Sequence, residues 1–234
     1  MSMRIDGAGR NRWAVLAATA LGAFSATFMG TSVNVALPTL VEVFGPSFPV
    51  VQWVVLAYLL STSALLPIIG RLGDMLGKKA IFLAGFGVYI LGSLLCGLAP
   101  SIEALVALRA IQGIGSAVLS SIGLAIVTDV FPAEERGRAI GVTGSVLSTG
   151  IVVGPTLGGA LIDAFGWEWV FFSGVPIGLV GALLAVRFVP AYSAGERQRF
   201  DFAGAALLFL SLLSLSLALT LGQGLGFTAP LPLG

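Results

Sequence analysis

Residues 80–99 read AIFLAGFGVYILGSLLCGLA, an apolar run without a charged residue. A helix needs about 20 mostly apolar residues to cross the hydrocarbon core of a bilayer. Strands are not favoured, because strands of membrane barrels are short and alternate apolar with polar residues. Six other stretches resemble this one, and we expect membrane-spanning helices over 13–37, 50–69, 80–99, 103–128, 139–162, 168–189 and 202–222.

The composition of the whole chain agrees with a membrane location. The 234 residues are 57% hydrophobic and 10% charged, whereas soluble domains carry about 25% charged residues. This chain lacks the charge to cover a surface that faces water, so lipid must cover much of it. The alternative for the first apolar run is a cleaved signal peptide, but the run is too long and six more follow.

The residues that most enzymes rely on are scarce. The chain has no histidine and one cysteine, Cys96. These counts exclude a disulfide within the chain, a cysteine or histidine metal site and a Ser–His hydrolase triad. We therefore expect no enzyme activity, no metal, no cofactor and no nucleic-acid partner.

The basic residues are distributed unevenly between the two sides of the predicted spans. Eleven of the twelve lie before span one or between spans two and three, four and five, or six and seven. The charged residues in the opposite connections are all acidic. Because cytoplasmic loops are enriched in Lys and Arg, we expect a multi-pass protein of the plasma (cytoplasmic) membrane. Its N-terminus would be cytoplasmic and, with seven spans, its C-terminus outside.

The remaining basic residue, Arg109, lies about two turns inside span four. A charge at the centre of a membrane helix costs at least ~2.5 kcal/mol on insertion scales. The alternative is an arginine that snorkels to the outer interface. With Gln112 one turn away, we favour an arginine that faces the bundle interior and has a functional role.

Glycines form two further patterns. Gly150, Gly154 and Gly158 share one face of span five, where small residues let another helix approach closely, and Pro155 should bend that helix. Residues 70–79 read GRLGDMLGKK, which we expect to form a short charged loop between spans two and three. The alternative to a functional role is generic helix packing for the glycine face and an ordinary turn for residues 70–79.

Three motifs resemble the major facilitator superfamily. Residues 70–79 resemble its signature loop, residues 108–115 (LRAIQGIG) its span-four motif, and residues 150–159 (GIVVGPTLGG) its span-five antiporter motif. Finer likenesses, to the fourteen-span drug:proton antiporters, are VNVALP at 33–38, WEWVF at 167–171, VPIG at 175–178 and FDFAG at 200–204.

The resemblance implies an all-α membrane fold: the six-helix N-terminal half of the major facilitator fold plus a seventh transmembrane helix. It divides the chain into the six-helix bundle at 1–190, a cytoplasmic linker at 191–200, and an additional helix with an outer tail at 201–234. The superfamily builds transport from two halves, and we expect these 234 residues to hold one of them without the C-terminal half.

The resemblance also implies roles for individual residues. Arg109 and Gln112 would take part in proton coupling. The cytoplasmic gate would comprise Gly70, Arg71, Asp74, Gly77, Lys78 and Lys79. The antiporter motif would comprise Gly150, Gly154, Pro155, Gly158 and Gly159. Candidate cavity-lining residues are Asn34, Gln52 and Tyr58, with helix-to-helix hydrogen bonding or placement at the membrane interface as the alternatives.

Four positions depart from the family pattern. Met29 stands where an acidic residue is frequent, Met75 where a basic residue follows the aspartate, Glu168 where an arginine is usual and Gly174 where an asparagine is usual. Met29 removes the span-one carboxylate that could carry a proton.

These observations leave three hypotheses. The first is the N-terminal part of a proton-coupled efflux transporter that exports hydrophobic or cationic small molecules by alternating access. Its partners would be substrate, protons, the lipid bilayer and a second half. The second is a half-size transporter that works as a homodimer. The third is a non-transporting membrane scaffold or a decayed fragment.

Overall fold

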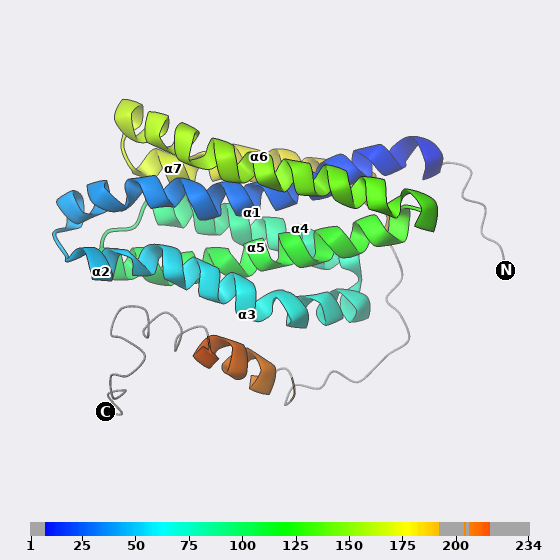
Figure 1. The fold of residues 1–234 in the computed structure, drawn as a ribbon, viewed down its shortest axis with the longest axis horizontal. Coiled ribbons are helices and arrows are strands. Elements are labelled where there is room, and N and C mark those ends of the chain that lie inside the picture. The colour runs from blue at the N-terminus through cyan, green and yellow to red at the C-terminus, as the bar shows by residue number, and fades with distance from the viewer. Residues whose placement is uncertain (1–7, 192–203, 205, 216–234) are drawn as a thin grey trace.

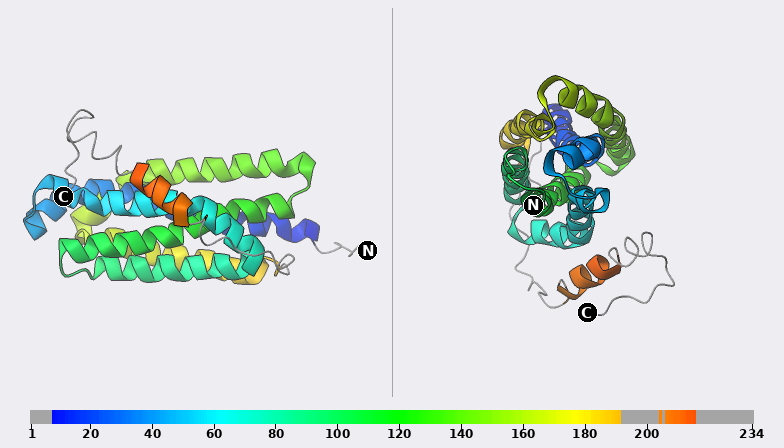
Figure 2. Two further views of the ribbon diagram at one scale, coloured as in Figure 1. Left: turned by 90° about the horizontal axis from the view of Figure 1, so that it is seen from below. Right: turned by 90° about the vertical axis from the view of Figure 1, so that its left-hand side faces the viewer.

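The computed structural model describes residues 8–191, 204 and 206–215. Residues 8–188 form a bundle of long, nearly parallel helices (Figures 1 and 2). The helices of the bundle are α1 (Ala8–Phe44), α2 (Phe48–Val51), α3 (Trp53–Leu76), α4 (Lys78–Gly97), α5 (Ile102–Val130), α6 (Ala133–Phe165), α7 (Glu168–Phe172) and α8 (Gly174–Phe188).

Six spans in this bundle are long and apolar enough to cross a membrane. They correspond in order to the first six spans predicted from the sequence. Two of them begin with a short helix: α2 leads into α3 at Gln52, and α7 leads into α8 at Ser173. The prediction of six long helices is therefore confirmed.

The predicted seventh span, 202–222, falls largely outside the described residues. Within this stretch the structure describes an apolar helix at Ala206–Leu215. The proposed domain boundaries after residue 190 remain predictions.

Helix ends differ from the sequence-based limits. The first span was expected to end at residue 37, but α1 continues through Pro38 to Phe44. A proline inside a membrane helix removes one backbone hydrogen bond, and neighbouring helices can compensate for that loss. The same tolerance explains why α6 runs without a break through Pro155.

The expected loop at residues 70–79 is almost entirely helical. Helix α3 continues to Leu76, α4 begins at Lys78, and Gly77 alone separates them. Gly77 has φ +93°, a left-handed conformation that residues with a side chain rarely adopt. One glycine thus reverses the chain, and Asp74 lies in the last turn of α3.

Helices α1 and α6 pack closely along the face predicted from glycine spacing. Gly150, Gly154 and Gly158 are buried. A Cβ added at Gly154 would collide with Thr31 Oγ1 and lie 3.1 Å from the carbonyl oxygen of Phe28. The hydroxyl of Thr31 donates a hydrogen bond to the carbonyl of Gly150, at 3.3 Å. The prediction that these glycines form one close-packing face is confirmed.

Glycines of helix α5 let it pack closely against both α3 and α4. A Cβ at Gly113 would lie 2.7 Å from the backbone oxygen of Tyr58 in α3, and one at Gly115 would lie 2.6 Å from the backbone nitrogen of Tyr89 in α4. Both glycines follow Arg109 within the span-four motif. Close approach on two sides therefore encloses the arginine between α3 and α4.

Candidate functional site

Arg109 is fully buried, with 0% of its surface exposed. This confirms that it faces the bundle interior rather than snorkelling to the outer interface. Its Nε donates to the carbonyl oxygen of Val54 at 2.9 Å, and its Nη1 donates to Oε1 of Gln112 at 2.7 Å. Helix α3 and the next turn of α5 therefore supply two neutral acceptors.

Two aromatic rings also lie near the guanidinium of Arg109. The guanidinium carbon lies 4.0 Å from the centre of the Tyr58 ring and 5.8 Å from that of Phe171. A cation over an aromatic face gains about 0.5–2 kcal/mol, most when water is excluded. Among the described residues Arg109 has no ion pair, and its Nη2 has no hydrogen-bond partner.

A chain of hydrogen bonds extends the site to α4. Nε2 of Gln112 donates to Oγ of Ser93 at 2.7 Å. A Cβ at Gly92 would lie 2.9 Å from Cβ of Gln112, so this glycine lets the two helices meet at the level of Gln112. Ser93 thus holds the amide whose oxygen accepts from Arg109. Ser93 was not predicted, because nothing in its sequence position singles it out.

Tyr58 anchors the other side of the arginine. Its hydroxyl lies 2.6 Å from the carbonyl oxygen of Ala26 in α1 and 2.7 Å from Oγ of Ser116 in α5. Tyr58 was a candidate for cavity lining, but it is buried in this structure and helps to enclose Arg109. The other two candidates, Asn34 and Gln52, are exposed. Asn34 donates to carbonyl groups of its own helix, and Gln52 lies at the junction of α2 and α3.

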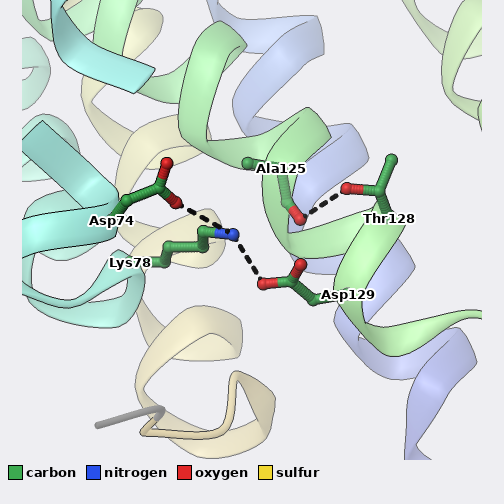
Figure 3. Close-up of polar contacts among 5 residues, drawn as sticks. All are labelled: Asp74, Lys78, Ala125, Thr128 and Asp129. Atoms are coloured by element: carbon green, nitrogen blue, oxygen red, sulfur yellow. Dashed lines mark hydrogen bonds and ion pairs between the residues drawn. The ribbon is translucent and has the colours of Figure 1, made fainter. Parts of the chain in front are cut away.

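A second polar site lies at the basic end of the bundle, where the α3–α4 turn meets the end of α5 (Figure 3). Nζ of Lys78 lies 2.7 Å from Oδ2 of Asp129 and 3.3 Å from Oδ1 of Asp74. Asp129 was not predicted, although its place near the end of α5 puts an acid opposite the basic α3–α4 turn. Lys79 Nζ donates instead to the carbonyl oxygen of Val186, at 2.8 Å.

The remaining basic residues with described side chains, apart from Arg109, lie at this same end. Arg12 Nη1 lies 3.1 Å from Oε1 of Glu135. Arg138 lies over the ring of Trp13, 5.2 Å from its centre. These contacts join the start of α1 to the start of α6. Of the other predicted gate residues, Arg71 is exposed and Gly70 half-buried.

The fold and both sites define a multi-pass helical membrane protein with a buried charged network. The model of the Major Facilitator Superfamily matches residues 19–233, and the chain belongs to this family of transporters.

Two transport proteins are similar in sequence to most of this chain. The chain is 36% identical over 203 residues to the riboflavin transporter RibZ of Clostridioides difficile (strain 630), an alignment that covers 86% of this chain and 44% of RibZ. It is 36% identical over 221 residues to the multidrug resistance protein Stp of Mycobacterium tuberculosis (strain CDC 1551 / Oshkosh), covering 94% of this chain and 41% of Stp. The chain therefore spans less than half the length of these relatives.

A solved structure shows the same fold. The crystal structure of the human organic anion transporter MFSD10 (TETRAN) aligns with a TM-score of 0.67 and 20% identity, covering 87% of this chain and 55% of that one. At this identity the likeness concerns the fold alone.

Proposed function

We propose that this chain forms the N-terminal half of a proton-coupled efflux transporter for small hydrophobic molecules, working by alternating access. The observation that carries the proposal is the fully buried Arg109, hydrogen-bonded to Gln112, in a family member whose relatives include a multidrug resistance protein. Charged residues inside membrane spans are costly and usually mark transport or proton pathways.

The coupling role falls to Arg109 through its hydrogen bonds rather than through an ion pair. An arginine stays protonated in proteins, so Arg109 would not carry the transported proton. It would bias the charge state and hydration of a neighbouring acceptor as the two halves move. Gln112 keeps the guanidinium oriented toward the interior of this half.

Lys78 and Asp129, with Asp74, would act as the cytoplasmic latch of the transporter. The pair at 2.7 Å joins the α3–α4 turn to the end of α5. A latch of this kind holds three helix ends in one arrangement and releases them when access alternates. We place this end in the cytoplasm because the described basic residues other than Arg109 gather there.

The exposed face of α6 supports a second helical body as partner. Gly137, Gly141 and Gly144 have open space where a Cβ would point, and small residues favour contact between membrane helices. The outward residues of α4 and α8 include Leu91 and Leu183 at 60% and 68% exposure, and α6 also exposes Val152, at 72%. The partner would be a C-terminal half or a second copy of this chain.

Reconstitution tests the proposal. The chain alone, and the chain joined to the C-terminal half of Stp, would be placed in separate proteoliposomes with an imposed pH gradient. We expect pH-driven movement of a hydrophobic fluorescent dye only where twelve core helices can form. Dye movement that ignores the pH gradient would contradict proton coupling, and no movement in either preparation would contradict transport.

A mass measurement in mild detergent separates the two kinds of partner. A dimer of the chain alone, active in the same assay, would replace the half-transporter proposal with the homodimer. A strictly monomeric chain that needs the added half would exclude the homodimer.

A further inference from the structure

Three arginines gather around an aromatic pair where the start of α1 meets the start of α6. The rings of Trp13 and Phe131 pack edge to face, with centres 5.5 Å apart. The guanidinium carbon of Arg138 lies 5.2 Å from the centre of the Trp13 ring, and that of Arg12 lies 5.8 Å from the centre of the Phe131 ring. Nε of Arg136 donates to the Phe131 carbonyl oxygen at 3.0 Å. Rings and backbone thus hold three guanidinium groups in place, and we call Arg12, Trp13, Arg136 and Arg138 the arginine corner.

The arginine corner lies at the level where the apolar spans begin. The spans expected from the sequence start at residues 13 and 139, immediately after Arg12 and Arg138. Trp13 is 40% exposed, and tryptophan is enriched at the membrane–water interface because its ring is amphipathic. The corner therefore lies at the depth of the lipid headgroups, at the end of the bundle that we place in the cytoplasm.

The protein satisfies the charges of the corner in part. Arg12 Nη1 lies 3.1 Å from Oε1 of Glu135. Within the described part of the chain, Arg138 makes no hydrogen bond or ion pair, and Arg136 makes none beyond the bond from its Nε. Both side chains are exposed. Three arginines against Glu134 and Glu135 leave an excess positive charge, and most of the N–H donors of two arginines remain open.

The α3–α4 turn at the same end of the bundle differs, because its lysines already have partners. Nζ of Lys78 lies 2.7 Å from Oδ2 of Asp129 and 3.3 Å from Oδ1 of Asp74. Nζ of Lys79 donates to the carbonyl oxygen of Val186 at 2.8 Å. The arginine corner is thus the place at this end where basic groups from two helices come together with donors open to a ligand.

We propose that the arginine corner binds the phosphate group of an anionic phospholipid in the cytoplasmic leaflet. A guanidinium presents paired N–H donors in a fixed planar arrangement that matches phosphate oxygens. The ligand is a lipid rather than soluble phosphate because apolar surface continues from the corner into the membrane. Val142, one turn beyond Arg138 on α6, is 38% exposed, and Trp13 lies beside the same guanidinium. The bound lipid joins the starts of α1 and α6, and this role does not depend on the transport cycle proposed above.

Native mass spectrometry of the purified full chain in a non-ionic detergent tests the proposal. The probes are dioleoyl phosphatidylglycerol, which is anionic, and dioleoyl phosphatidylcholine, which has the same acyl chains and no net charge. Each basic residue near an anionic headgroup contributes about fivefold to binding, so two open arginines predict a Kd roughly 25-fold lower for the first phosphatidylglycerol. Equal binding of the two lipids would overturn the proposal. Equally tight binding of glycerophosphoglycerol, the same headgroup without acyl chains, would show a site for soluble phosphate and would overturn it too.

Two arginine variants separate a local site from the general attraction of a basic protein end for anionic lipid. Arg138→Gln should weaken the first phosphatidylglycerol about fivefold. Arg187→Gln is the matched control, because Arg187 is also exposed at this end, and its guanidinium lies 5.6 Å from the ring centre of its own neighbour Phe188. We expect this control to bind like the wild type. Equal losses in the two variants would contradict a site at the corner.

An acidic variant should strengthen binding, which a poorly folded chain would not do. Glu135→Gln releases Arg12 from its ion pair and removes a negative charge beside the site, so we expect the Kd for phosphatidylglycerol to fall about fivefold. Glu42→Gln, an exposed acid near the opposite end of α1, should leave the Kd unchanged. If Glu135→Gln binds no more tightly than Glu42→Gln, Arg12 takes no part in the site, and the proposal, which needs both helices, fails.

Discussion

Replacing Gly154 with alanine should separate α1 from α6 and destabilise the bundle. The added Cβ would collide with Thr31 Oγ1 and lie 3.1 Å from the Phe28 carbonyl oxygen and 3.2 Å from Ser32 Oγ. The threonine hydroxyl can rotate, but the Phe28 carbonyl belongs to the α1 backbone, so the helices must shift. Overpacking of this kind costs about 1–3 kcal/mol.

The chain carries its own reporter for this measurement. Cys96 is its one cysteine and is fully buried, so a thiol-reactive fluorophore labels it only when the bundle opens. About 2 kcal/mol corresponds to a fall in Tm of about 4–8 °C for a chain of this size. The assay is a thermal melt of the purified chain in mild detergent.

Gly141→Ala is the matched control, because a Cβ there has nothing within 4 Å. Alanine favours a helix over glycine by about 0.5–1 kcal/mol, so the control should melt at the same temperature or slightly higher. If Gly154→Ala melts at no lower temperature than Gly141→Ala, α1 and α6 do not pack closely at Gly154.

Two further substitutions test the polar sites. Asp129→Asn should lower Tm more than Asp74→Asn, because Asp129 lies 2.7 Å from Lys78 whereas Asp74 lies 3.3 Å away and its side chain is 66% exposed; the reverse order would exclude Asp129 as the main partner of Lys78. Ser93→Ala leaves the buried amide of Gln112 without its acceptor, which costs about 1–3 kcal/mol and should lower Tm by several degrees in the same thiol-labelling melt; an unchanged Tm would show that the amide has another partner.

The spans could be predicted because lipid imposes a simple requirement on sequence. A helix that crosses the membrane must be apolar for about 20 residues, so an apolar run such as 80–99 predicts a span by its length alone. Helix ends follow other rules. Whether α3 stops at residue 69 or continues to Leu76 depends on where the chain can reverse, and Gly77 alone decides that.

The candidate site was predictable in part for a similar reason. Charged residues deep inside a span almost always face the interior of the bundle, and this rule predicted the burial of Arg109. Gln112 was predicted with it because it lies one turn away on the same helix. Val54 and Phe171, and the Ser93 that holds Gln112, could not be predicted, because they come from other helices and have no periodic relation to Arg109. Asp129 was not predicted, because a single acidic residue near a helix end resembles an ordinary interfacial residue.

The most direct test of the account is substrate-driven proton flux in proteoliposomes that contain the chain joined to a C-terminal half. Arg109→Gln removes the buried charge but keeps hydrogen-bonding groups, and Arg187→Gln removes an exposed charge near the end of α8 as a control. We predict that Arg109→Gln abolishes the flux while Arg187→Gln retains it. Equal flux in the two variants, with both folded by the Cys96 melt, would contradict a coupling role for the buried arginine.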